Sequence, residues 1–195
     1  MTHQDKSPFL AIIGGSGLNH LPILEGAHRR FVRTPYGEPS CPMTLGTICG
    51  HPMVFLARHG HGHTIMPGDI NYRANIDAMK RAGVTDLVSL SACGSFREDL
   101  PPGSFVLVDQ YVDRTHKRES SFFGKGCVAH VSMAHPVCPK LSGALTLAAR
   151  ELKIDHSEGG IYLCMEGPQF STRAESFLYR EWDCSVIGMT AMPEA

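Results

Sequence analysis

The sequence predicts a single α/β domain over residues 1–195, in which a twisted, mostly parallel or mixed sheet is flanked by helices. Short apolar runs that suit buried strands alternate with amphipathic segments that suit helices, and this alternation is typical of a largely parallel sheet. The chain has 195 residues and 43% apolar composition, which is enough for one hydrophobic core. No internal repeat or linker divides the sequence.

The strand predictions come first along the chain. Apolar runs that end in polar or glycine-rich turns predict buried strands at residues 9–13, 53–57, 86–90 and 185–188. The stretch from Gly46 to Gly50 separates two short apolar segments and predicts a hairpin. Two prolines and a glycine make residues 34–40 a loop.

Helices are predicted from apolar periodicity and from capping residues. The first covers Asp69–Ala82, with Lys80 and Arg81 in its last turn and Gly83 as a left-handed cap. The third begins at Thr172, because Thr172 and Glu175 have capping-box spacing, and it follows the loop of residues 166–170. The second can begin at Pro139, and its expected apolar face comprises Leu141, Ala144, Leu145, Ala148 and Leu152.

Charge and cysteine content narrow the range of functions. A formal net charge of −1 provides no general field for nucleic acid or an anionic membrane, so a small anion held by local groups fits better. Seven cysteines without a C-x-x-C pair argue against a disulfide framework and a zinc ribbon, and we expect reduced, mostly buried thiols. The absence of a signal-peptide pattern and of an apolar run near about 20 residues predicts a cytoplasmic protein.

Polar groups follow the predicted strands at the edge of the sheet where α/β proteins bind ligands. Arg58 and His59 come directly after the apolar run 53–57, and Ser16, Ser91 and Thr190 follow other strands. Arginine forms bidentate charged bonds, and hydroxyls and glycine-rich turns add neutral donors, so an oxyanion such as phosphate is expected. A structural carboxylate is the alternative partner for Arg58.

Two other patterns allow different interpretations. The turn Gly14–Gly17 does not match a dinucleotide fingerprint, because His20 stands where glycine is needed, and no Gly-Lys-Ser/Thr follows; a tight connection is the alternative to a phosphate contact. Histidines at 59, 61 and 63 could chelate a metal in a hydrolase. We find no matching downstream ligand set, and the chain is short for a (β/α)₈ barrel, so His61 and His63 can equally be solvated loop residues.

Seven ordered motifs resemble the trimeric purine nucleoside phosphorylases, and within them most closely the 5′-methylthioadenosine phosphorylases. The resemblance covers Phe9 to the last residue. The motifs lie at residues 12–18, 34–37, 56–60, 71–75, 92–94, 166–170 and 189–194.

This resemblance implies a nucleoside phosphorylase-like fold, phosphorolysis of a purine nucleoside, no metal or organic cofactor, and a homotrimer. It assigns phosphate binding to Ser16, Arg58, His59, Ser91, Ala92 and Thr190, and direct catalytic roles to Arg58, His59 and Ser91. It assigns substrate binding to Ala92, Cys93, Gly94, Phe170, Ser171, Met189 and His130, the last across a subunit interface. Taken alone, Met189, Phe170, Ser171 and His130 could be a core methionine, a packed aromatic, a helix cap and a surface residue.

The resemblance also implies an aspartate that assists departure of the purine, on a strand beyond the motif 189–194. The sequence stops at Ala195, so we expect a C-terminally truncated domain, either a fragment of a longer enzyme or a chain that binds phosphate and nucleoside without turnover. Methylthioinosine and 6-oxopurine nucleosides remain alternative substrates, because the groups that would distinguish the purine 6-position lie mainly in the missing part.

Overall fold

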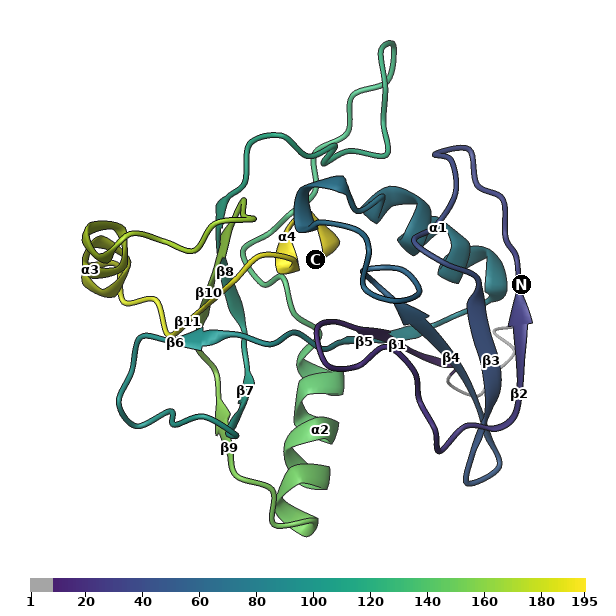
Figure 1. The fold of residues 1–195 in the computed structure, drawn as a ribbon, viewed down its shortest axis with the longest axis horizontal. Coiled ribbons are helices and arrows are strands. Elements are labelled where there is room, and N and C mark those ends of the chain that lie inside the picture. The colour runs from purple at the N-terminus through teal and green to yellow at the C-terminus, as the bar shows by residue number, and fades with distance from the viewer. Residues whose placement is uncertain (1–8) are drawn as a thin grey trace. The chain divides into compact units, whose positions relative to one another are not determined.

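The computed structural model describes residues 9–195 and contains two compact units, residues 9–91 and 92–195 (Figure 1). Both units combine strands with helices, so the predicted α/β class with a mixed sheet is confirmed. The strands belong to three sheets, where the sequence led us to expect one. The expectation of a single domain over 1–195 stays a prediction, and each unit is described by itself.

The first unit contains a five-stranded mixed sheet in the order β2-β3-β4-β1-β5. Strand β1 pairs in parallel with β4 and β5, and β3 pairs antiparallel with β2 and β4. The predicted strands 9–13, 53–57 and 86–90 are therefore three neighbours whose carboxyl ends share one edge. The bounds are β1 Leu10–Gly14, β2 Glu25–Arg30, β3 Met43–Ile48, β4 His51–Ala57 and β5 Asp86–Ser89.

Helix α1, Tyr72–Ala82, lies against this sheet and packs Ala78 and Met79 into its core (Figure 1). It begins three residues later than predicted, because Asn71 caps it: the Asn71 side chain accepts a bond from the Ala74 N–H at 3.1 Å. A short 3-10 helix, η1 Pro67–Asp69, precedes the cap. Gly83 ends α1 with φ 94°, as predicted.

The predicted hairpin is present, but its turn is shorter than expected. The turn lies at Cys49 and Gly50, and Gly46 is inside β3, opposite Met53. Gly46 is needed for close packing and not for the turn. A Cβ there would lie 2.7 Å from both the Glu25 carbonyl oxygen and the Leu24 Cγ.

The second unit contains two sheets. The four-stranded sheet has the order β6-β11-β10-β8, in which β8, β10 and β11 are parallel and β6 is antiparallel. Of these four strands, only β11 was predicted from the sequence. The bounds are β6 Gly94–Ser95, β8 Gln110–Arg114, β10 Ile161–Met165 and β11 Val186–Gly188, and a parallel pair joins β7 Phe105–Leu107 to β9 His156–Glu158.

The helices of this unit are α2 Pro139–Glu151, α3 Arg173–Glu181 and the short α4 Ala191–Glu194. The predicted starts of α2 and α3 are confirmed, but the expected apolar face of α2 is wrong in part. Leu141 and Leu145 are half-buried, whereas Ala144, Ala148 and Leu152 are exposed. Helix α2 packs on β7 and β9, and two three-residue strands are too small to cover its whole apolar face.

The cysteines only partly match the expectation. None of the seven forms a disulfide, but Cys49, Cys93, Cys127 and Cys138 are exposed, so the prediction of mostly buried thiols is wrong. These four residues lie in turns and loops, where the backbone itself is exposed. Across residues 9–195, no helix combines the length and apolar character that a membrane crossing requires.

Helix α3 provides a test of the fold. Thr172 accepts a bond from the Glu175 N–H, and the Glu175 carboxylate accepts one from the Thr172 N–H at 2.7 Å. We expect Thr172→Ala to lower the free energy of unfolding by about 1 kcal/mol, because the Glu175 N–H loses its hydroxyl acceptor and the hydroxyl no longer donates to the Glu175 carboxylate. Urea denaturation measures the change. Thr172→Ser keeps the hydroxyl and serves as control, and an equal loss in both variants would contradict the capping role.

Candidate functional site

Arg58 lies where three parallel strands of the first unit end. Its side chain is completely buried, and it follows β4 directly. The guanidinium donates to the hydroxyl of Ser89 at 2.7 Å and to the carbonyl of Leu90 at 3.0 Å, both at the end of β5. Its backbone N–H donates to the Gly14 carbonyl at 2.9 Å, at the end of β1. Arg58 therefore joins the ends of β1, β4 and β5.

The glycine turn after β1 packs directly on this guanidinium. A Cβ at Gly15 would lie 2.7 Å from Arg58 Nη1, 2.8 Å from the Leu90 oxygen and 3.4 Å from the Ser91 Cα. No larger residue fits there without moving Arg58 or the backbone. The structure thus brings the turn, Arg58 and Ser91 together, and Ser16 is the exposed residue that follows Gly15.

His59 is held by its neighbouring loop. Its side chain is buried, and Nδ1 lies 2.8 Å from the carbonyl oxygen of Ile65. A carbonyl only accepts, so Nδ1 carries the proton and Nε2 is left as an acceptor in the neutral ring. The ring centroids of His59 and His63 lie 4.3 Å apart, with the planes tilted by 30°. His61 and His63 are exposed. Within residues 9–195, no group of three or more His, Cys, Asp or Glu side chains is arranged to hold a metal ion.

The remaining predicted residues belong to the second unit. Thr190 follows β11 and is buried, while Met189 is half-buried and packs on Gly167, where a Cβ would lie 2.6 Å from the Met189 sulfur.

Other predicted site residues of this unit are exposed. They include Ala92, Cys93 and Gly94. Phe170 is 82% exposed, and His130 lies in an exposed stretch without regular structure. Among the described residues, no hydrogen bond joins Phe170 or His130 to Thr190.

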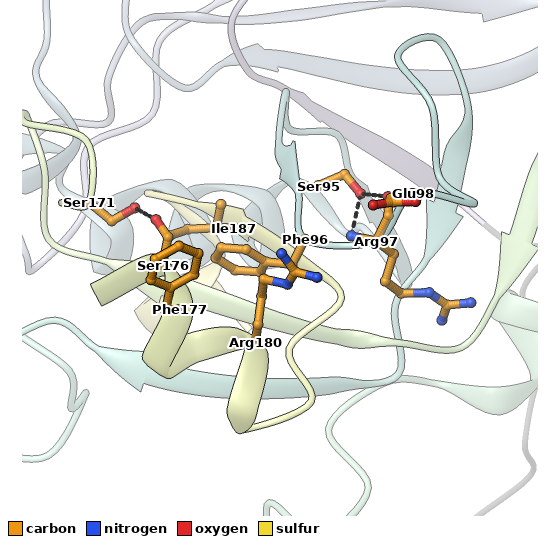
Figure 2. A pocket seen from close by; sticks show the side chains of 9 residues that line it. All are labelled: Ser95, Phe96, Arg97, Glu98, Ser171, Ser176, Phe177, Arg180 and Ile187. Carbon is orange, nitrogen blue, oxygen red and sulfur yellow. Dashed lines mark hydrogen bonds between the residues drawn. The ribbon is translucent and has the colours of Figure 1, made fainter. Parts of the chain in front are cut away.

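Ser171 faces a pocket of about 420 Å³ in the second unit (Figure 2). Its hydroxyl is bonded to that of Ser176 at 2.8 Å, so it acts as a local link to α3. Helix α3 contributes the aromatic and charged side chains of Phe177 and Arg180 to the wall. The full lining is Ser95, Phe96, Arg97, Glu98, Ser171, Ser176, Phe177, Arg180 and Ile187.

A buried ion pair that was not predicted from the sequence lies beside Met192. Arg118, with 2% of its side chain exposed, donates to the Glu166 carboxylate at 3.1 Å and to the Met192 carbonyl at 2.5 Å. Arg118 follows β8, and the unpredicted strand β8 explains why it was missed. The apolar run at residues 105–108 contains β7, and β8 itself contains only two apolar residues, Tyr111 and Val112, so its local signal is weak.

The Glu166 carboxylate accepts three hydrogen bonds. Burial alone would raise its pKa, but the N–H of His116 at 2.6 Å, the guanidinium of Arg118 and the N–H of Lys117 together lower that pKa below its usual range. Glu166 therefore stays ionised and does not serve as a proton donor near neutral pH.

Cys164 contacts the backbone of Met192, which Arg118 also contacts. Its sulfur accepts from the Met192 N–H at 3.3 Å, and its thiol faces the Met192 carbonyl at 3.7 Å. Burial raises the pKa of this thiol to about 11. The backbone of Met192 is thus held from one side by Cys164 and from another by Arg118.

Comparison with known proteins places these features in a family. The family model described as the phosphorylase superfamily matches residues 9–195. The S-methyl-5'-thioadenosine phosphorylase of Bradyrhizobium diazoefficiens is 67% identical over 186 residues, covering 95% of this chain and 64% of the relative. That of Rhodospirillum rubrum is 58% identical over 195 residues, covering 100% of this chain and 66% of the relative.

Solved structures agree with this placement. A methylthioadenosine phosphorylase from an antarctic soil metagenomic library has a TM-score of 0.90 and 48% identity, covering 96% of this chain and 67% of that one. The Schistosoma mansoni methylthioadenosine phosphorylase in complex with tubercidin has a TM-score of 0.92 and 36% identity, covering 96% of this chain and 74% of that one. The chain spans somewhat less than two thirds of the length of the two bacterial relatives.

Thiol reactivity tests the environment of Cys164. Because its pKa is raised to about 11, only about one thiol in a thousand is ionised at pH 8, and the side chain is also buried. We expect the exposed Cys49, Cys93, Cys127 and Cys138 to react with an aromatic disulfide reagent at pH 8 much faster than Cys164. Mass spectrometry of the labelled peptides measures the order. Labelling of Cys164 as fast as Cys127 would contradict the structure.

Proposed function

The chain belongs to the phosphorylase superfamily, and we propose that it acts in the phosphorolysis of 5′-methylthioadenosine, with inorganic phosphate as cosubstrate and adenine and 5-methylthioribose 1-phosphate as products. The observation that carries this proposal is the buried guanidinium of Arg58 at the ends of β1, β4 and β5, against a glycine turn. Such an arrangement suits a tetrahedral anion. The names of the similar phosphorylases supply the substrate.

In the proposed reaction, phosphate attacks the anomeric carbon as the bond to the purine breaks. The sugar becomes oxocarbenium-like, so the protein gains rate by fixing the negative phosphate beside the developing positive charge. Arg58 would carry the main charged contact, and His59 would present Nε2 toward a protonated phosphate oxygen. The full proposed phosphate set is Ser16, Arg58, His59, Ser91, the Ala92 amide and Thr190.

The nucleoside contacts are proposed from the family resemblance. Met189 would lie under the ribose, and Phe170 and Ser171 would border the base, with Ala92, Cys93 and Gly94 beside them. His130 would reach the sugar pocket of a neighbouring copy in a homotrimer. This position accounts for an exposed histidine in a long exposed segment of the isolated chain. We further propose a cytoplasmic protein that needs no metal or organic cofactor.

A matched substitution at Arg58 tests the proposed phosphate site. We expect Arg58→Ala to weaken phosphate binding by at least about 30-fold, since loss of a bidentate charged contact to a buried anion costs at least about 2 kcal/mol. Calorimetric titration of the 195-residue chain with phosphate measures the affinity, and a purine-release assay with 5′-methylthioadenosine measures turnover. Arg150→Ala, which removes an exposed arginine of the second unit, is the control.

The two assays separate the candidate functions. Equal phosphate affinity in Arg58→Ala and in the unsubstituted chain would contradict the phosphate site. Phosphate and nucleoside binding without purine release would favour a binding role over an enzymatic one. If hypoxanthine is released from methylthioinosine faster than adenine is released from 5′-methylthioadenosine, the preferred substrate belongs to the 6-oxopurine class. Activity that a chelator abolishes would instead support the histidine-based metal hydrolase.

A further inference from the structure

Three segments of the second unit meet at one guanidinium. Arg118 follows β8, Glu166 follows β10, and Met192 lies beyond β11, so the carboxyl ends of three adjacent parallel strands are joined by one side chain. The guanidinium also donates to the backbone carbonyls of Glu166 at 2.8 Å and Met165 at 3.4 Å. The resemblance to the phosphorylases gives Arg118 no role.

We propose that Arg118, neutralised by Glu166, is a positioning residue that fixes the segment 189–194, and with it Thr190 and Met189, for ligand binding. This inference rests on the proposed function, because Thr190 and Met189 are its proposed phosphate and sugar contacts. Arg118 itself acts through the backbone of Met192 and is not a catalytic residue.

The chemistry of the pair suits a fixed support. Arg118 has 2% of its side chain exposed, so its charge must be neutralised, and the ionised Glu166 does so at 3.1 Å. The same carboxylate accepts from the N–H groups of His116 and Lys117, which ties residues 116–118 to the end of β10. Both carboxylate oxygens of Glu166 therefore take part in structural hydrogen bonds.

The restraint is transmitted to Thr190 over a short distance. Met192 is held through both of its backbone groups, with its carbonyl on Arg118 and its N–H on the sulfur of Cys164. Thr190 lies two residues before it, at the start of α4, and Met189 rests on Gly167, one residue after Glu166. Movement of Met192 or Glu166 would therefore shift both proposed ligand contacts.

Lysine cannot replace the arginine in this role. The guanidinium is a planar fork whose three nitrogens reach different acceptors on Glu166, Met165 and Met192. A lysine ammonium preserves the charge but has a single nitrogen, which cannot span acceptors on opposite sides of the fork. Arg118→Lys thus removes the geometry while keeping the ion pair possible.

The test compares Arg118→Lys and Glu166→Gln with Arg150→Lys, which alters an exposed arginine–carboxylate pair of the same unit. Amide hydrogen exchange reports the order of residues 189–194, and calorimetry reports affinity for phosphate and for 5′-methylthioadenosine. We expect both Arg118→Lys and Glu166→Gln to speed exchange of the 189–194 amides at least 10-fold and to weaken ligand binding at least 10-fold. Exchange in β10 should rise much less than at 189–194, and Arg150→Lys should match the unsubstituted chain.

The outcomes distinguish this inference from the proposed function. Unchanged exchange at 189–194 overturns the positioning role, whatever the affinities are. Faster exchange with unchanged affinity, or exchange that rises equally throughout β10 in both variants, shows a general structural role and also overturns it. If the unsubstituted chain binds neither ligand, the proposed function fails, and exchange alone then decides whether Arg118 orders the segment.

Discussion

Burial of the Arg58 guanidinium is the constraint on which the first unit depends. A fully buried cation needs fixed acceptors, and the Ser89 hydroxyl and Leu90 carbonyl provide two of them at the end of β5. The same guanidinium requires that residue 15 carry no side chain. One charged group therefore sets the relative positions of three strand ends, and it explains why a glycine turn follows β1.

The second unit also contains a buried arginine, Arg118, whose partner is the Glu166 carboxylate. Arg118 is buried at the ends of parallel strands, where Glu166 neutralises its charge and the backbone N–H groups of His116 and Lys117 donate to that carboxylate. Because its charge is neutralised within the protein, the Arg118 guanidinium suits a structural role, and we propose that it positions the segment 189–194. For Arg58, the strand-end location beside a glycine turn suits an external oxyanion.

The sequence predicted those elements whose signals are local. Apolar runs revealed β1, β4, β5 and β11, and capping chemistry placed the start of α3 at Thr172. It did not reveal β8, in which only Tyr111 and Val112 are apolar, and so Arg118 was missed. Strand β10 was also missed, although Ile161–Met165 is an apolar run. The exposed part of α2 was also unpredictable, since periodicity shows that a helix is amphipathic but not how large its covering strands are. Arg58 could be singled out because a charge joined directly to a buried strand is conspicuous in sequence.

The most direct test of the central claim is the guanidinium nitrogen signal of Arg58 in the ¹⁵N NMR spectrum, assigned by its loss in Arg58→Lys, during titration with phosphate. We expect a saturable shift of this signal that follows the calorimetric binding curve, while the exposed Arg97 and Arg150 signals respond weakly. Saturable phosphate binding that leaves the Arg58 signal unmoved would contradict it.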